Sequence, residues 1–354
     1  MRLASIEVIP YALPFRRPYV TARGQLDQRE MVLLRLRSED GLIGLGEAVP
    51  LSLRGGAALE QVVKELELLG ELGELDEDSL TSGAMTLSAP ARCAALTALL
   101  DLRGRQAAAE SPSSAPLADS APLPCNATLV AGEPAAVAED ALRWAEDGFS
   151  SFKLKLGAGD DVGQVRAVRE AVGPAARIRI DANAAWDLET ASRTLEALAP
   201  FEIELAEQPV ATLEEMATLA QSTSIPIAGD ESIETRADAE RANAIGACRL
   251  AGVKLSKVGG PEAAIEIAEL LPSYLSSALD GPVGIAAAAQ VAQTLREVGG
   301  RGDPGLAHGL ATQRLFSSTI ASTECELRDG MLHLPDGPGL GVEIDEDALQ
   351  AHRL

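Results

Sequence analysis

Between residues 125 and 311 the chain alternates between short apolar segments with strand character and longer segments with helix character. Eight strands are expected, at 125–130, 151–156, 177–182, 203–207, 226–230, 250–255, 274–278 and 306–311. The intervening segments predict helices at 133–147, 161–172, 187–199, 212–222, 236–245, 261–271 and 283–296. This alternation favours an α/β fold with a (β/α)₈ barrel of the TIM type. The alternative is a doubly wound parallel sheet, which usually has fewer strands and a phosphate-binding loop after its first strand.

The residues on either side of this region predict a second unit. Residues 1–50 alternate as strands do, and residues 56–108 are helical in pattern. The segment from Pro14 to Gly24 is interpreted as a loop. We therefore expect an α+β domain at 1–108, a linker at 109–124, the barrel at 125–319 and a tail at 320–354 that returns to the first domain.

The composition excludes several classes of partner. The net charge is −23 and aromatic residues make up 3%, so a nucleic-acid surface is not expected. No uncharged apolar run approaches the ~18 residues of a membrane helix, and the first twenty residues do not resemble a signal peptide. The four cysteines lie far apart without a C-x-x-C motif, which favours a reduced, cytoplasmic protein.

Three carboxylates follow consecutive barrel strands, at the edge where the active site of a TIM barrel lies. These residues are Asp181, Glu207 and Asp230, and no His or Cys stands near them in the sequence. Oxygen ligands of this kind select Mg²⁺, with Mn²⁺ as a substitute, rather than zinc. Each acid alone is equally well explained as a helix N-cap, but the common register of all three favours a metal site.

Lysines are expected on two sides of these carboxylates. Lys153 and Lys155 are two residues apart, so both side chains are predicted to point into the barrel from the second strand. Lys254 enters from the sixth strand, across the barrel mouth, whereas Lys257 has the opposite parity and is interpreted as a surface residue. A divalent cation between lysines suits removal of a proton next to a carboxylate, provided that the pKa of the base falls from its ordinary value of ~10.4.

One motif favours a protein of a different class. Residues 157–163 contain three glycines between a strand and a helix, as in a dinucleotide-binding loop. However, Asp160 and Asp161 occupy the predicted helix N-terminus, where they would repel a pyrophosphate. A dinucleotide-binding protein or a non-catalytic barrel is therefore kept as a weaker alternative to an enzyme.

Taken together, the motifs resemble the enolase superfamily. The matching residues are Lys153-x-Lys155, Asp181-x-Asn183, Glu207-Gln208-Pro209, Asp230-Glu231-Ser232, Lys254 and Gly259-Gly260. The resemblance covers nearly the whole chain and implies a modified barrel with an N-terminal capping domain completed by the C-terminal tail. Lysines on opposite strands, without a histidine on the sixth or seventh strand, are similar to the muconate-lactonizing subgroup.

The resemblance also implies a role for each candidate residue. The three carboxylates would bind Mg²⁺, Lys155 would remove the α-proton, Lys254 would stabilise the enediolate, and Lys153 would lower the pKa of Lys155. Four further residues would support the ligands or contact the substrate: Asn183, Glu231, Ser276 and Arg23.

Several reactions are compatible with this resemblance, all acting on a small carboxylate. Residues 276–287 and 307–312 are similar to o-succinylbenzoate synthases, which implies dehydration of 2-succinyl-6-hydroxy-2,4-cyclohexadiene-1-carboxylate in menaquinone biosynthesis. The eighth strand lacks the Asp-x-Asp of dipeptide epimerases. An N-acylamino acid racemase or a muconate cycloisomerase is the alternative, and the family is often oligomeric, so a homo-oligomer is implied.

Overall fold

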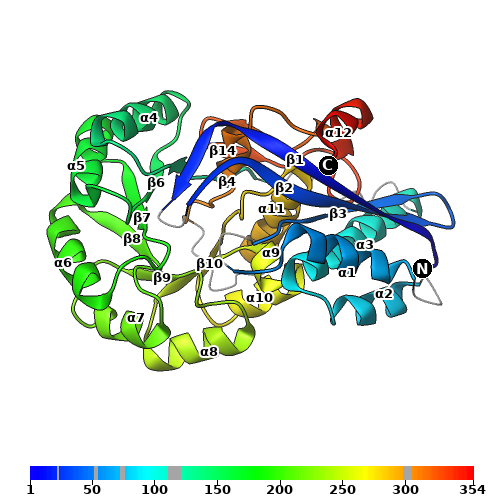
Figure 1. Ribbon diagram of the computed structural model, residues 1–354, viewed down its shortest axis with the longest axis horizontal. Helices are drawn as coiled ribbons and strands as arrows, with labels where there is room; N and C mark the ends of the chain where they lie inside the picture. Colours follow the sequence, from blue (N-terminus) through cyan, green and yellow to red (C-terminus); the bar gives the residue numbers. More distant parts are fainter. Residues whose placement is uncertain (22–23, 52–54, 72–75, 111–120, 298–304) are drawn as a thin grey trace.

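The structure is a computed structural model, and it describes residues 1–21, 24–51, 55–71, 76–110, 121–297 and 305–354. Figure 1 shows two units, a barrel of parallel strands with helices on its outside and a long antiparallel sheet flanked by helices. The expected architecture, a TIM-type barrel with an α+β capping domain, is confirmed. Among the described residues, no helix is both long and apolar enough to cross a membrane.

The capping domain is built on an antiparallel sheet of three strands. These are β1 (Leu3–Thr21), β2 (Gly24–Ser38) and β3 (Ile43–Ala48), in that order. The inward side chains of β2 are fully buried against the helices, and they include Leu34 and Leu36. Met31 and Leu33, which point to the other face, are fully buried in the large core cluster that includes the barrel residues. The apolar run in the middle of β2 therefore places both faces of the sheet in a core.

The prediction of a loop from Pro14 to Gly24 was wrong. β1 continues to Thr21, with a register shift between Pro14 and Tyr19 and renewed pairing of Tyr19 with Leu26. Proline has no N–H for the ladder, so two prolines in this segment gave it the pattern of a loop, whereas an edge strand accommodates them at an irregularity.

Three helices cover one face of the capping sheet: α1 (Leu59–Leu69), α2 (Glu77–Ala84) and α3 (Ala89–Glu110). α3 lies directly on β3 because Gly44 and Gly46 present no side chain to it. A Cβ atom on Gly46 would stand 1.9 Å from the backbone oxygen of Ala94. These two glycines therefore set the distance between helix and sheet.

Seven parallel strands form the barrel sheet, in the order β11-β10-β9-β8-β7-β6-β5. They are β5 (Ala127–Leu129), β6 (Ser151–Lys155), β7 (Arg177–Asp181), β8 (Ile203–Glu207), β9 (Ile227–Gly229), β10 (Leu250–Val253) and β11 (Ser273–Leu275). All seven correspond to strands predicted from the sequence, because each is a short apolar or alternating run bounded by turn residues.

The helices of the barrel lie on its outer surface (Figure 1). They are α4 (Pro134–Glu146), α5 (Asp161–Val172), α6 (Leu188–Leu198), α7 (Leu213–Ala220), α8 (Arg236–Ile245), α9 (Leu255–Val258), α10 (Pro261–Ala268) and α11 (Pro282–Glu297). Side chains cap several of them, and Thr212 and Thr235 form capping boxes at α7 and α8. The short helix α9 was not predicted.

The eighth predicted strand, at 306–311, is reduced to two isolated bridges. His308 bridges to Cys125 beside β5, and Gly309 bridges to Ser276 beside β11. The backbone of His308 forms hydrogen bonds with Pro124 and Asn126, at 2.7 and 2.9 Å, and that of Gly309 with Leu275 and Ser277, at 2.8 and 3.0 Å. The His308 ring also accepts a hydrogen bond from the backbone N–H of Leu275 at 3.1 Å. This segment thus joins the two edges of the seven-stranded sheet.

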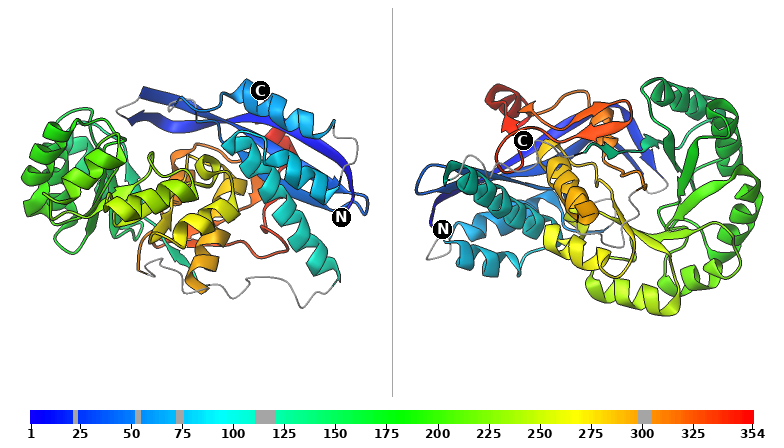
Figure 2. Two further views of the ribbon diagram at one scale, coloured as in Figure 1. Left: turned by 90° about the horizontal axis from the view of Figure 1, so that it is seen from below. Right: turned by 180° about the vertical axis from the view of Figure 1, so that it is seen from behind.

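The C-terminal segment returns to the capping domain, as expected (Figure 2). It contains β12 (Ala321–Thr323), β13 (Glu326–Arg328), β14 (Met331–His333), β15 (Glu343–Ile344) and α12 (Glu346–His352). β14 also pairs with β4 (Leu123–Pro124), and Arg353 bridges to Tyr11 of β1. Asp101 of α3 accepts a hydrogen bond from the backbone of Leu340, which ties the same segment to the helices.

Candidate active site

A cluster of three buried carboxylates lies at the C-terminal ends of neighbouring strands. Asp181 and Glu207 are the last residues of β7 and β8, and Asp230 directly follows β9. Each offers a carboxylate oxygen, and these oxygens lie within 4.8 Å of one another. Their side chains are fully buried. Adjacent parallel strands bring residues of equal register together, as the pairing of Asp181 with Glu207 shows.

The donor set of this cluster fits a hard divalent cation. All three ligands are carboxylate oxygens, and Mg²⁺ and Mn²⁺ prefer such oxygens to nitrogen or sulfur. Three negative charges held together away from water also need compensation by positive charge. The cluster is typical of a magnesium site.

Lys153 and Lys155 reach this cluster from β6. Lys153 Nζ lies 2.7 Å from Glu207 Oε1 and 2.9 Å from Asp181 Oδ2. Lys155 Nζ lies 2.6 Å from the same Oδ2 atom and donates to Asn183 Oδ1 at 3.1 Å. Both lysines therefore share the inner face of one strand, and their ammonium groups compensate the buried carboxylates.

Two more lysines contact the third carboxylate, and one of them lies in a different place from the one predicted. Lys254 contacts Asp230 Oδ2, and Lys257 Nζ lies 2.9 Å from Asp230 Oδ1. Lys257 was interpreted as a surface residue, but it is only 4% exposed. The prediction assumed that the strand continues, with side chains alternating between its two faces. Instead, β10 ends at Val253 and α9 begins at Leu255, and in a helical turn residues three apart, such as Lys254 and Lys257, lie on the same side.

These contacts shift the pKa values of the cluster. Burial acts to raise the pKa of Asp181, but the ammonium groups of Lys153 and Lys155 outweigh it, and the value is lowered. Burial together with the neighbouring Asp181 charge raises the pKa of Glu207. For Lys155, burial is the largest single influence and acts to lower the pKa, but the negative charge of Asp181, together with smaller effects of Tyr19 and Glu207, outweighs it, and the pKa is raised. Without a cation, Lys155 is thus held in its protonated form.

Asn183 and Glu231 support the cluster from the loops that follow β7 and β9. The backbone N–H of Asn183 donates to Asp181 Oδ1 at 2.9 Å, and its side-chain amide donates to Glu231 Oε1 at 3.1 Å. Asn183 has a φ of +49°, a left-handed conformation that asparagine tolerates better than most residues. The turn that orients Asp181 therefore depends on this residue type.

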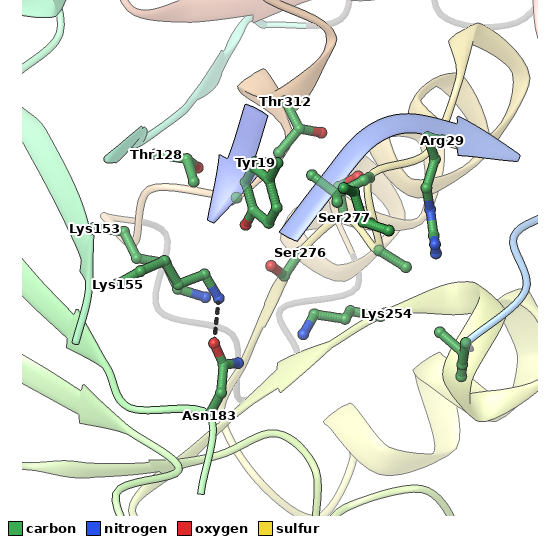
Figure 3. Close-up of a pocket in the computed structure, with 15 residues that line it drawn as sticks. Tyr19, Arg29, Thr128, Lys153, Lys155, Asn183, Lys254, Ser276, Ser277 and Thr312 are labelled. Carbon is green, nitrogen blue, oxygen red and sulfur yellow. Dashed lines mark hydrogen bonds between the residues drawn. The ribbon is translucent and has the colours of Figure 1, made fainter. Parts of the chain in front are cut away.

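A pocket opens above the lysines, between the barrel and the capping domain. In Figure 3, Lys153 and Lys155 approach it from one side and Lys254 from the opposite side. Ser276 lines it too, whereas Arg23 lies outside the described residues. The pocket is lined by Tyr19, Leu26, Arg29, Leu51, Thr128, Lys153, Lys155, Asn183, Lys254, Ser276, Ser277, Ala278, Leu279, Gly309 and Thr312.

Among the residues that the capping domain contributes to this pocket are two polar ones that the sequence did not indicate. Tyr19 reaches it from the end of β1 and Arg29 from β2, and both are buried. Arg29 also donates to the backbone oxygen of Pro50 at 2.7 Å. No local motif marks either residue, because their approach to the barrel depends on how the two domains pack together.

In the glycine-containing loop at 157–163, aspartate side chains of the loop accept hydrogen bonds from its backbone N–H groups. Asp160 Oδ1 accepts from the backbone N–H of Gly163 at 2.9 Å, and Asp161 Oδ1 accepts from that of Gly157 at 2.8 Å. The N–H groups that would hold a pyrophosphate are thus satisfied within the loop. This arrangement weighs against a dinucleotide site.

Comparison with known families and proteins identifies relatives over the whole chain. Residues 136–348 match the family "Enolase C-terminal domain-like", and residues 4–112 match the N-terminal domain of the mandelate racemase / muconate lactonizing enzyme family. The o-succinylbenzoate synthase of Thermobifida fusca is 39% identical over 68% of this chain and 74% of its own. Muconate cycloisomerase 1 of Pseudomonas putida is 30% identical over 97% of this chain and 96% of its own.

Solved structures of relatives share the same architecture. The muconate lactonizing enzyme from Pseudomonas fluorescens, complexed with muconolactone, superposes with a TM-score of 0.90 at 28% identity, over 100% of this chain and 99% of its own. The dipeptide epimerase from Cytophaga hutchinsonii, complexed with Mg and D-Ala-L-Val, gives 0.89 at 26% identity, over 99% and 98%.

Proposed function

Because this chain belongs to the mandelate racemase / muconate lactonizing enzyme family of the enolase superfamily, we propose that it is a Mg²⁺-dependent o-succinylbenzoate synthase. It would dehydrate 2-succinyl-6-hydroxy-2,4-cyclohexadiene-1-carboxylate. The charge of the pocket carries the proposal. Lys153, Lys155, Lys254 and Arg29 line it, and no carboxylate does so among its described lining residues. Such a pocket suits a substrate that carries two carboxylates, one on the ring and one on the succinyl tail.

Sequence similarity supports the same reaction over its competitors. The identity with the Thermobifida fusca synthase is 39% over 68% of this chain, against 30% for muconate cycloisomerase 1 and 28% for the hydrophobic dipeptide epimerase of Enterococcus faecalis, each over 97%. A dipeptide carries an ammonium group, which needs an acidic partner. The loop from Gly309 to Thr312 presents none to the pocket.

The lysines would carry out the proton transfers. Neutral Lys155 would take the α-proton onto Nζ, and the electrons of the C–H bond would pass into an enediolate. The C–O bond of the hydroxyl would then break, with the same proton passing from Lys155 to the leaving oxygen to form water. Lys254, on the opposite side of the pocket, would remain cationic beside the enediolate throughout.

The carboxylate cluster would set the protonation state of the base. A divalent cation held by Asp181, Glu207 and Asp230 would compensate their charge, lower the pKa of Lys155 and stabilise the developing enediolate. Lys153 would act in the same direction, since two neighbouring ammonium groups repel each other. Lys155, which the Asp181 carboxylate keeps protonated, would thereby become available as a base.

The direct test is incubation of the purified protein with this substrate and Mg²⁺. Loss of the diene absorbance with formation of o-succinylbenzoate is expected. This turnover should fall by orders of magnitude in Lys155→Ala and stay at the wild-type level in Lys64→Ala, a control at an exposed lysine of α1. Absence of turnover by a folded wild-type protein that binds Mg²⁺ would exclude the proposed reaction while leaving the family assignment intact.

A muconate cycloisomerase is the second candidate, because its similarity extends over 97% of this chain and the related structure superposes with a TM-score of 0.90. Turnover of muconate in the same preparation would favour it. An N-acylamino acid racemase would share the enediolate, and exchange of deuterium into the α-carbon of an N-succinyl amino acid would detect that activity.

A further inference from the structure

Tyr274 lies beneath the carboxylate cluster, inside the barrel. It is the middle residue of β11, it is fully buried, and its hydroxyl donates a hydrogen bond to Glu207 Oε2. It does not line the pocket above the lysines, so a substrate there would not touch it. The hydroxyl therefore acts on the site only through Glu207.

The neighbouring strand leaves space for this hydroxyl. Gly252 of β10 is directly opposite Tyr274 in the sheet. A Cβ atom at Gly252 would stand 2.9 Å from the Tyr274 hydroxyl oxygen and 3.1 Å from Cζ. Glycine at this position lets the phenol cross the barrel interior to reach Glu207 on β8.

The guanidinium group of Arg179 lies over the ring of Tyr274. Its guanidinium carbon lies 5.1 Å from the ring centroid. The guanidinium is itself held by an ion pair with Glu204 and by a hydrogen bond to the backbone oxygen of Ala307 at 2.6 Å. This contact favours the observed orientation of the tyrosine, with its hydroxyl directed at the carboxylate.

We propose that Tyr274 is a positioning residue for the cation site, holding Glu207 Oε2 so that the carboxylate is already oriented when a divalent cation binds. Partners of this kind commonly change metal affinity by about 10–100-fold when they are removed, because the ligand must then be ordered at the moment of binding. The inference rests on the divalent-cation part of the proposed function, and it holds for any of the candidate substrates.

The test compares two variants that each remove one buried hydroxyl. Tyr274→Phe removes the donor to Glu207. Tyr11→Phe removes an equivalent donor, since the Tyr11 hydroxyl lies 2.9 Å from the buried Glu47 in the capping domain. We expect Tyr274→Phe to bind Mn²⁺ about 10–100-fold more weakly than wild type, and Tyr11→Phe to bind it with wild-type affinity. Binding is measured by electron paramagnetic resonance of free Mn²⁺, without substrate.

Equal Mn²⁺ affinity in wild type and Tyr274→Phe would overturn the inference and leave the proposed function standing. A wild-type protein that binds no Mn²⁺ would overturn both. Should Tyr274→Phe fail to fold, the wild type provides the readout, because it has three tyrosines. With ¹³C at tyrosine Cζ, Tyr11→Phe and Tyr19→Phe assign two signals. The remaining signal then belongs to Tyr274, and we expect its chemical shift to change when Mg²⁺ is added. An unchanged Tyr274 signal would overturn the inference.

Discussion

Lys257 Nζ lies 2.9 Å from Oδ1 of Asp230, and the pair is buried. Asp230 is also contacted by Lys254 through its other oxygen. A candidate metal ligand is therefore held between two ammonium groups, one of which lines the pocket while the other does not. Lys254 is therefore available to a substrate in the pocket, whereas Lys257 stabilises the site from outside it.

Replacement of Lys257 by Met should destabilise the fold, because Asp230 would lose one of its two buried countercharges. A loss of about 3–5 kcal/mol in the free energy of unfolding is typical when one partner of a buried ion pair is removed. Urea denaturation measures it. Lys64→Met, at an exposed position, should change stability by less than about 0.5 kcal/mol. Equal effects of the two variants would contradict the buried pairing.

Mg²⁺ should stabilise the wild-type protein. A cation that binds only the folded state adds about 2.7 kcal/mol at a concentration of 100 times its Kd. A rise in Tm with Mg²⁺, reversed by a chelator, is expected for wild type and for Asp187→Asn, which alters an exposed helix cap. Asp181→Asn should show little or no rise. A similar Mg²⁺ response in Asp181→Asn would argue against the three-carboxylate site.

Lys155→Ala should reduce kcat by about 10²–10⁴-fold, the usual contribution of a positioned general base. Lys254→Ala should also lower kcat, since its ammonium group would face the enediolate. The two can be distinguished by isotope exchange in D₂O, because only a group that removes the α-proton can exchange it. Retained exchange in Lys155→Ala would assign the base to another residue.

Glu47 should make stability depend on pH. It is 2% exposed, accepts hydrogen bonds from Tyr11 at 2.9 Å and from the backbone of Gly281 at 2.6 Å, and burial with the nearby Asp280 charge raises its pKa to about 8. An unfolded glutamate has a pKa near ~4.3, so between these values the folded state holds an extra proton. The stabilisation is complete below the unfolded value and is lost as pH rises through the folded one.

The free energy of unfolding should therefore fall between pH ~5 and 8, by up to about 1.4 kcal/mol per pH unit. Urea titrations at several pH values measure this slope. Glu47→Gln should flatten it, and Glu30→Gln, at an exposed position of β2, should not. A wild-type slope that survives in Glu47→Gln would refute the assignment to this residue.

Gly46→Ala should destabilise the capping domain by about 3 kcal/mol, near the upper end of the usual cost of overpacking. The new methyl group would meet the backbone of α3 at Ala94, which cannot move aside by a change of rotamer. Gly159→Ala is the matched control, because nothing lies within 4 Å of its Cβ position. Comparable Tm values for the two variants would contradict the close approach of α3 and β3.

The barrel could be predicted because its signals are local. Each strand is a short run of apolar or alternating residues between turn residues, and the C-terminal ends of neighbouring parallel strands bring Asp181, Glu207 and Asp230 together. The loop predicted at 14–24 failed because prolines mark a loop and an irregular edge strand in the same way. The position of Lys257 depended on a turn of α9 too short to leave a periodic pattern.

Other parts of the site depend on contacts distant in sequence. Tyr274 resembles any apolar strand residue until β10 is placed beside β11 and Glu207 of β8 lies within reach of the Tyr274 hydroxyl. Arg29 and Tyr19 belong to the pocket only because the capping sheet packs over the barrel. Such contacts arise from tertiary packing, and a single sequence carries no local pattern for them.

The segment around His308 and Gly309, which pairs with both edges of the barrel sheet, has a consequence for thermal inactivation. Only a few backbone hydrogen bonds connect that segment to each side, whereas β6 pairs with β7, and β7 with β8, along most of their length. If this segment separates from the sheet on heating, β5 and β11 become edge strands. Their unpaired backbone N–H and C=O groups can then pair with the same edges of another molecule. Thermal inactivation should then proceed through aggregation, and its rate should rise with protein concentration.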